Sequence, residues 1–201
     1  MPMRPRGILF DMDGTLTEPL LDFPRIKAEM KIGDRPILEA LAEMSPSQRR
    51  VAEEVLHRHE DEAARNATLN RGCVELLEWL REQAIRTAIV TRNTARSAAI
   101  VLELHRLRAD ALVTRDDGVH KPDPAAVHLA CERIGLASSE VWMVGDGEYD
   151  IAAAVAAGVP AVWLSHGRVR AFAHGPWIEV RDLCELHELL QQCRPHVAEE
   201  T

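Results

Sequence analysis

The sequence lacks the long apolar stretch that a membrane-spanning helix needs. No apolar run approaches about 20 residues. The basic residues at 1–6 are followed by only four apolar residues before Asp11, which is too short for the core of a secretory signal. We therefore expect a cytoplasmic protein without a membrane partner.

Cysteine is scarce and shows no scaffold spacing. The four cysteines, Cys73, Cys131, Cys184 and Cys193, form no CxxC pair. Disulfide frameworks need a higher cysteine density, so we interpret these residues as buried or surface thiols in a reducing compartment.

Basic residues are fewer than acidic ones. The chain carries 24 Lys and Arg against 32 Asp and Glu, a net charge of −8, and it has no Lys/Arg run. A nucleic-acid backbone would be repelled by this balance. A small anion can still bind where a metal ion, a lysine and backbone N–H groups compensate locally. We expect a small-molecule substrate and no nucleic-acid partner.

What is present is a soluble, core-forming composition, with 46% apolar and 28% charged residues in a chain of 201. Short apolar runs alternate with helical patterns, which predicts an α/β fold: a doubly wound, mainly parallel, five-stranded Rossmann-like sheet covered on both faces. The predicted strands are residues 7–10, 87–90, 111–113, 141–144 and 161–164, and the predicted helices are 94–105, 123–135, 147–157 and 181–193. Residues 194–201 are expected to fray.

The interval between the first two strands has helical signals only. Helices are predicted at residues 22–31, 36–44, 46–64 and 71–84, the third beginning at a capping box, Ser45 with Gln48, followed by Pro46. The sequence therefore predicts a small helical cap of residues 18–68, inserted into an α/β core of residues 1–17 and 69–201.

Two carboxylates stand at the end of the first predicted strand. Asp11 and Asp13 are two positions apart, so in extended backbone they point the same way. Either a cation lies between them or one of them keeps its proton. Gly14 lets a bound group approach the backbone closely.

Polar residues follow the other strands in the same manner. Thr91, Arg92 and Asn93 follow the second strand, and Asp146 follows the fourth. Ligands of parallel α/β sheets bind beyond these carboxyl ends. Pro122 restricts Lys121 to an extended conformation, which keeps the lysine in a loop before the next helix.

Other interpretations of these residues are weaker. An EF-hand loop starting at Asp11 would have Leu16 in place of its glycine, and the segment 145–150 lacks the third glycine of a dinucleotide fingerprint. Thr91 alone could be a helix cap, and Lys121 alone a solvated lysine. His57 and His59 diverge on a helix, so we interpret them as surface histidines.

The order of these motifs, over residues 7–165, resembles the haloacid dehalogenase (HAD) superfamily of phosphohydrolases, in the subgroup of phosphoglycolate phosphatases and β-phosphoglucomutases. In that family a nucleophilic Asp heads a DxDGTL run, a Thr or Ser follows the second strand, a Lys precedes Pro, and GDxxxD follows the fourth strand. The matching residues are Asp11, Asp13, Thr91, Lys121, Asp146 and Asp150.

The resemblance implies a Mg²⁺ site and a two-step reaction. Mg²⁺ would be held by the carboxylates of Asp11 and Asp146 and the backbone carbonyl of Asp13, with Asp150 orienting Lys121 or a metal-bound water. Asp11 would attack phosphorus to form an aspartyl-phosphate. Asp13 would protonate the leaving alcohol and then activate water. The predicted substrate-binding residues are Thr91, Arg92, Asn93 and Lys121.

The predicted function is a Mg²⁺-dependent phosphatase acting on a small phosphorylated metabolite, and we expect a monomer. A phosphomutase of the β-phosphoglucomutase type is the alternative, and a non-enzymatic binding module is a weaker one because all the catalytic positions are filled. The predicted cap is shorter than is typical of the subgroup. Its basic residues, Arg25, Lys27, Lys31 and Arg35, are candidates for binding a second anionic group of the substrate.

Overall fold

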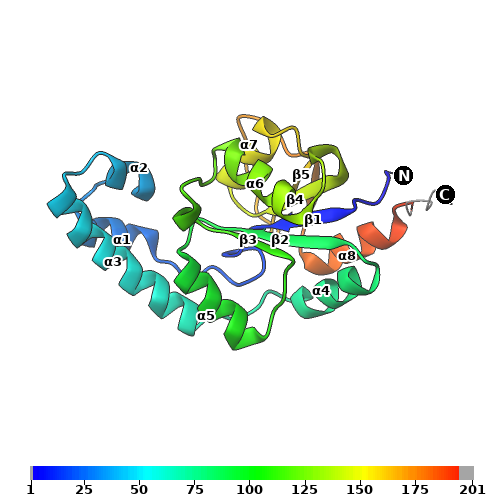
Figure 1. The fold of residues 1–201 in the computed structure, drawn as a ribbon, viewed down its shortest axis with the longest axis horizontal. Helices are drawn as coiled ribbons and strands as arrows, with labels where there is room; N and C mark the ends of the chain where they lie inside the picture. The colour runs from blue at the N-terminus through cyan, green and yellow to red at the C-terminus, as the bar shows by residue number, and fades with distance from the viewer. Residues whose placement is uncertain (1, 195–201) are drawn as a thin grey trace.

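The computed structural model describes residues 2–194 as a parallel sheet with helices on both faces and a helical arm at one side (Figure 1). The sheet has six strands in the order β3-β2-β1-β4-β5-β6. The chain builds outward from β1 to β3 and then returns to the other side of β1 with β4. The strands are β1 (Gly7–Phe10), β2 (Arg86–Val90), β3 (Ala111–Val113), β4 (Val141–Gly145), β5 (Ala161–Leu164) and β6 (Ile178–Val180). The predicted fold class is confirmed.

The predicted strand count of five is wrong, because β6 adds a sixth strand at the edge of the sheet. It pairs in parallel with β5, and the backbone N–H of Ser165 donates to the Val180 carbonyl over 2.8 Å. The strand has three residues, and only Val180 is buried. So short a segment, with a charged residue at its centre, carries no strand pattern in the sequence.

Alternate residues of the central strands face two separate apolar layers. Ile8 and Phe10 pack in one layer and Leu9 in the other, as the two-residue period of a strand requires. The first layer is covered by α4 (Cys73–Glu82), α5 (Ala95–His105) and α8 (Leu183–Gln192), and the second by α6 (Pro124–Ile134) and α7 (Glu148–Ala156). Single 3₁₀ turns, η1 (Arg115–Asp117) and η2 (Ser138–Glu140), precede α6 and β4.

Residues 18–68, called the insertion below, carry three helices between β1 and α4. They are α1 (Phe23–Met30), α2 (Ile37–Ala42) and α3 (Pro46–Arg65), on the left of Figure 1. Local signals start two of them, since Asp22 accepts the Arg25 N–H over 3.0 Å and Gln48 accepts the Ser45 N–H over 3.2 Å. The helices share an apolar cluster of their own, built on residues that include Ile26, Leu41 and Leu56. The division into core and cap domains stays a prediction.

The end of α3 leaves this cluster and packs on α5 of the sheet layer. His59 lies in this half of α3, and the prediction that it is a surface histidine is wrong: it is 8% exposed, with Nε2 3.2 Å from Glu29 Oε2. His57 is exposed, as expected. The difference arises because α3 is enclosed between α1 and α5 where His59 faces inward.

The predictions on membrane helices, thiols and the C-terminal tail have different outcomes. Within residues 2–194, no helix combines the length and apolarity needed to cross a membrane. Cys73, Cys131 and Cys193 are buried thiols and Cys184 is partly exposed. Arg194 does not fray, because its N–H donates to the Pro2 carbonyl over 3.1 Å. The rest of the predicted tail, residues 195–201, lies outside the described residues.

Candidate active site

The carboxyl ends of β1, β2 and β4 meet at a cavity of about 530 Å³ between the sheet and the insertion. The N–H of Asp11 donates to the Val144 carbonyl over 2.9 Å, so the pairing of β1 with β4 continues to the first acidic residue. The cavity brings together all of the sequence-predicted site residues: Asp11, Asp13, Thr91, Arg92, Asn93, Lys121, Asp146 and Asp150. This is the edge at which parallel α/β sheets bind ligands.

Lys121 is the cation at the centre of the site. Its Nζ lies 2.5 Å from Oδ1 of Asp11 and 2.6 Å from Oδ1 of Asp150. The lysine is 2% exposed, and an ammonium group is buried to this extent only when it is paired. The loop that ends in Pro122 therefore delivers Lys121 to the nucleophile candidate, as the sequence predicts.

Asp13 has a different partner. The side-chain amide of Asn93 donates to Oδ2 of Asp13 over 2.7 Å, and the Asn93 N–H donates to the hydroxyl oxygen of Thr91 over 3.1 Å. Because this Thr91 oxygen already accepts a bond, its hydroxyl proton is available for an acceptor in the cavity. The loop after β2 thus supports Asp13 with an amide.

Asp146 and Asp150 come close to the backbone where glycines leave room. A Cβ built on Gly14 would lie 2.5 Å from Oδ2 of Asp146, and φ of Gly14 is +78°, so no other residue fits there without strain. The sequence predicted that Gly14 admits a bound group, and in the structure the Asp146 carboxylate takes that space. Arg168 also contacts Asp146, over 3.0 Å, and the N–H of Gly147 donates to Asp150 over 3.0 Å.

These carboxylates suit a divalent cation. One oxygen each from Asp11, Asp146 and Asp150 lies within 4.8 Å of the others, and hard oxygen donors are what Mg²⁺ prefers. The cluster contains the two predicted carboxylate ligands and adds Asp150. The carboxylate of Asp13, which the prediction assigns to proton transfer, is instead bonded to Asn93.

The pKa shifts of the site residues also favour a bound cation. Burial and the nearby Asp150 charge raise the pKa of Asp11 well above its usual range, against the effect of Lys121. Burial also raises the pKa values of Asp13 and Asp146. Burial disfavours the Lys121 ammonium, but the Asp11 and Asp150 carboxylates outweigh it, and the lysine pKa is raised. The site therefore has an excess of negative charge that a cation or protons must balance.

Two residues predicted to bind substrate are engaged with protein groups. The Arg92 guanidinium donates to the Lys121 carbonyl, lies 3.0 Å from Glu39 of α2, and stacks 4.2 Å above the Tyr149 ring. Asn93 is committed to Asp13. Both line the cavity, but these contacts position neighbouring groups and leave fewer donors for a ligand.

Several contacts at the site were not predicted. Arg115 pairs with Glu60 of α3, and His166 Nε2 lies 2.7 Å from the Gly14 carbonyl. Arg115 and His166 follow β3 and β5 closely, so the strand-end rule that found Asp11 applies to them too. Glu60 stands within a highly charged helix, and nothing in the sequence distinguishes it from its neighbours.

A larger hollow, of about 740 Å³, lies near Thr87 and Asp110, at the opposite ends of β2 and β3. It contains none of the motif residues. The smaller cavity, with its buried carboxylates and buried lysine, is the chemically equipped one.

Comparisons with known proteins agree with this geometry. A family model described as haloacid dehalogenase-like hydrolase matches residues 22–158. The matched range includes Thr91, Lys121, Asp146 and Asp150, and it begins after Asp11 and Asp13.

Curated relatives extend the match. A haloacid dehalogenase-like hydrolase domain-containing protein of Arabidopsis thaliana is 31% identical in an alignment 160 positions long, gaps included, which covers 73% of this chain and 65% of that protein. The chain thus spans just under two thirds of the length of this relative. A phosphoglycolate phosphatase of Xanthomonas campestris pv. campestris is 30% identical in an alignment 181 positions long, gaps included, which covers 79% of this chain and 82% of that protein.

The fold also recurs among solved structures. A hydrolase from Pseudomonas syringae superposes with a TM-score of 0.77 at 23% identity, covering 94% of this chain and 99% of that chain. At this identity the likeness bears on the fold alone.

Proposed function

The chain belongs to the haloacid dehalogenase-like hydrolase family, and from this premise we propose that it is a Mg²⁺-dependent phosphatase that hydrolyses a small phosphate monoester through an aspartyl-phosphate on Asp11. Membership of this family and the similarity to a phosphoglycolate phosphatase support phosphate-ester hydrolysis. The metal ion, the intermediate and the roles of individual residues are parts of the proposal.

The observation that carries the proposal is the unequal environment of two neighbouring carboxylates. Asp11 is bonded to the Lys121 ammonium and Asp13 to the neutral Asn93 amide. The Lys121 ammonium favours the ionised carboxylate that a nucleophile must be, and a bound cation would add to this effect against the burial that raises the pKa of Asp11. Asp13 has no such cation bonded to it, and burial raises its pKa even though the Asn93 hydrogen bond favours the ionised form, so it can hold a proton, as a general acid must.

In the proposed first step, the Asp11 oxygen that is not bonded to Lys121 attacks phosphorus. The bond from phosphorus to the ester oxygen breaks, and Asp13 gives its proton to the departing alcohol. Lys121 offsets charge on Asp11 and on the transferring group, and the Thr91 hydroxyl donates to a phosphoryl oxygen. The protein then carries the phosphoryl group on Asp11, and Asp13 is ionised.

In the second step, Asp13 takes a proton from water as the water oxygen attacks the same phosphorus. The bond from phosphorus to Asp11 breaks, which releases inorganic phosphate and restores both residues. Asp13 acts first as an acid and then as a base, because losing its proton in the first step leaves it ionised and able to accept one in the second.

Mg²⁺ would be held by the carboxylates of Asp11 and Asp146, with Asp150 close enough to contribute. When bound it would neutralise phosphoryl charge and orient the ester. Arg168 also pairs with Asp146, but its side chain is 48% exposed, and ion pairs with an exposed partner contribute little stability. A cation can therefore displace that arginine at small cost.

The cavity indicates a small substrate with an apolar face. The insertion contributes Leu21, Phe23, Ile37, Leu38 and Leu56 to the cavity wall. Of the four basic residues proposed to bind a second anionic group, Lys27 alone lines the cavity among the residues described in that region. Its Nζ donates to the Asp34 carbonyl over 3.0 Å and pairs with no carboxylate within residues 2–194, so we assign that role to Lys27.

Hydrolysis of a broad panel of phosphate monoesters, with Mg²⁺ and after EDTA treatment, tests the proposal. We expect phosphate release from small monoesters that stops with EDTA and returns with Mg²⁺. Retention of the phosphoryl group on a bisphosphate intermediate would identify a mutase instead. A panel without turnover would overturn the assignment.

A further inference from the structure

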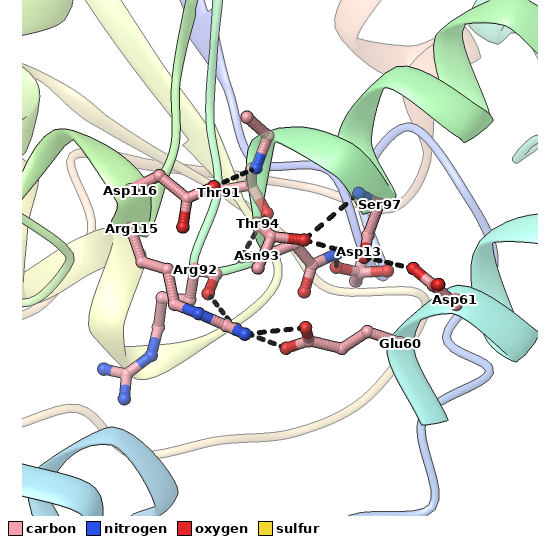
Figure 2. Close-up of polar contacts among 11 residues, drawn as sticks. Asp13, Glu60, Asp61, Thr91, Arg92, Asn93, Thr94, Ser97, Arg115 and Asp116 are labelled. Carbon is pink, nitrogen blue, oxygen red and sulfur yellow. Dashed lines mark hydrogen bonds and ion pairs between the residues drawn. The ribbon is translucent and has the colours of Figure 1, made fainter. Parts of the chain in front are cut away.

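The half of α3 that packs on α5 carries two buried acidic residues. Glu60 is 4% exposed and Asp61 is 9% exposed, although the helix is rich in charge and its other acidic residues stay nearer the solvent. Figure 2 shows the two carboxylates pointing from α3 toward different groups of the sheet domain. Buried carboxylates of this kind need partners, and the partners define what each one does.

Glu60 forms a two-point ion pair with Arg115 of η1. One guanidinium nitrogen of Arg115 lies 2.9 Å from Oε2, and the other contacts Oε1. Only 3% of the Glu60 side chain and 12% of the Arg115 side chain are exposed. A buried ion pair holds a helix no better than apolar packing would, so its value lies in fixing orientation.

Arg115 in turn holds the loop after β2 at two successive carbonyls. Its guanidinium donates to the Arg92 carbonyl over 3.0 Å, and its backbone N–H donates to the Asn93 carbonyl over 3.1 Å. Figure 2 shows this guanidinium between Glu60 and the Arg92 backbone. Two hydrogen bonds from Arg115 therefore hold the backbone on both sides of the Asn93 α-carbon.

Asn93 reaches Asp13 from this backbone, over 2.7 Å. Asn has two side-chain torsions, so the positions that its amide can reach are set by where its backbone is held. The orientation of the Asp13 carboxylate thus depends on the loop, the loop on Arg115, and Arg115 on Glu60.

We propose that Glu60 is a positioning residue for Asp13, acting through Arg115 and Asn93, so that proton transfer to the leaving group requires α3 to be seated on the sheet domain. The inference rests on the proposed function, since it assumes that Asp13 is the general acid. It adds that the insertion sets the geometry of the acid, besides covering the cavity.

Asp61 supplies a matched control one residue further along α3. It accepts a hydrogen bond from the Ser97 hydroxyl over 3.2 Å and pairs with Arg96 over 2.9 Å. It therefore also ties α3 to α5, but its contacts lead to the start of α5 and not to Asp13. Weaker packing between α3 and α5 would be common to both variants, whereas displacement of Arg115 is confined to the Glu60 variants.

The test compares two phosphate esters that differ in their need for an acid. One is 4-nitrophenyl phosphate, whose leaving group departs without protonation, and the other is the best alkyl phosphate from the screen, whose alkoxide does not. The variants are Glu60→Gln, the double variant Glu60→Gln with Arg115→Gln, Asp61→Asn and Asp13→Asn. The double variant has no unpaired charge, so it stays informative if Glu60→Gln alone unfolds, which thermal melting reveals.

We expect Asp13→Asn to lose far more kcat/KM on the alkyl ester than on 4-nitrophenyl phosphate, because kcat/KM reports the steps up to departure of the leaving group and not the shared hydrolysis of the intermediate. Glu60→Gln and the double variant should show the same selectivity, with about 10-fold more loss on the alkyl ester. Asp61→Asn should lower both rates equally. Equal losses on both esters in the Glu60 variants, or the selective loss in Asp61→Asn, would overturn the inference. Absence of selectivity in Asp13→Asn itself would instead overturn the proposed acid, and the inference with it.

Discussion

Asn93 donates its side-chain amide to Oδ2 of Asp13 over 2.7 Å, across 80 positions of sequence. The other carboxylate of the same motif, Asp11, is bonded to the Lys121 ammonium over 2.5 Å, and these two residues are 110 positions apart in the sequence. The two carboxylates of one short motif thus acquire different chemistry from two different loops.

Replacing Asp13 with Asn should lower kcat by about 10²- to 10⁴-fold on an alkyl phosphate, the usual contribution of a general acid and base. Asn keeps the size of the residue and removes the transferable proton. Steady-state phosphate release with Mg²⁺ measures the effect. The exposed Asp34 supplies the control: Asp34→Asn should retain the wild-type rate, and an Asp13→Asn rate within a few-fold of wild type would contradict the role.

Replacing Lys121 with Met should abolish activity and destabilise the metal-free protein by about 3–5 kcal/mol, because it leaves the buried carboxylates of Asp11 and Asp150 unpaired. Urea unfolding of the wild type and the variant measures the free energy difference. Adding Asp150→Asn should recover part of the loss, since one buried charge is then removed.

The same Lys121→Met deficit should depend on pH in a defined direction. The pKa of Asp11 is raised in the folded state by burial and by Asp150, so the folded protein binds this proton more tightly than the unfolded chain. Such a group contributes stability at acid pH and loses it as pH rises through the folded pKa. Because Lys121 lowers the pKa of Asp11, its removal raises that pKa further, and the variant deficit should therefore be larger at about pH 8 than at about pH 5. A deficit that grows on acidification would contradict this assignment.

Two ion pairs that join the insertion to the rest of the chain should contribute different amounts to the free energy of unfolding. The Glu60–Arg115 pair is buried, whereas Glu39, which pairs with Arg92, is 40% exposed. Glu60→Gln should cost about 3–5 kcal/mol in unfolding free energy because it leaves a buried guanidinium unpaired. Glu39→Gln should cost less than about 1 kcal/mol, as exposed pairs do. Similar costs from urea titrations would show that burial does not govern these contacts.

The cysteines give a prediction independent of the active site. Burial, with a smaller effect of Glu75, raises the pKa of the Cys73 thiol to about 12, so it carries almost no thiolate near pH 8. Labelling with a thiol-specific reagent should modify the partly exposed Cys184 first and leave Cys73 intact until the protein unfolds. Peptide mapping of the labelled protein identifies the sites. Rapid labelling of native Cys73 would show that this helix opens readily.

The sequence predicted which residues meet at the cavity because most of them follow strand ends. Asp11, Thr91 and Asp146 each follow an apolar run, and the carboxyl ends of parallel strands share one edge of the sheet. Lys121 was singled out by its resemblance to the lysine of the family motif, and Pro122 indicated only that it stays out of the following helix. Local rules of this kind need no knowledge of long-range packing.

Other features depend on packing that no local pattern encodes. The edge strand β6 is too short for a periodic signal, and Glu60 and His59 become buried only because α3 lies against α1 and α5. The direction of an arginine side chain also follows from its surroundings. Arg92 was predicted to bind substrate, but Glu39, Tyr149 and the Lys121 carbonyl already engage its guanidinium.

The central claim is that Asp11 carries the phosphoryl group between the two steps. Rapid acid quench of the Asp13→Asn variant during turnover of 4-nitrophenyl phosphate with Mg²⁺, followed by tandem mass spectrometry of the peptide that contains Asp11, tests it most directly. This ester needs little help from an acid in the first step, whereas the second step lacks its base, so the intermediate should accumulate. We predict a phosphoryl group on Asp11 that is absent from Asp11→Asn protein. Release of 4-nitrophenol without any phosphorylated Asp11, or near-normal turnover by Asp11→Asn, would contradict the account.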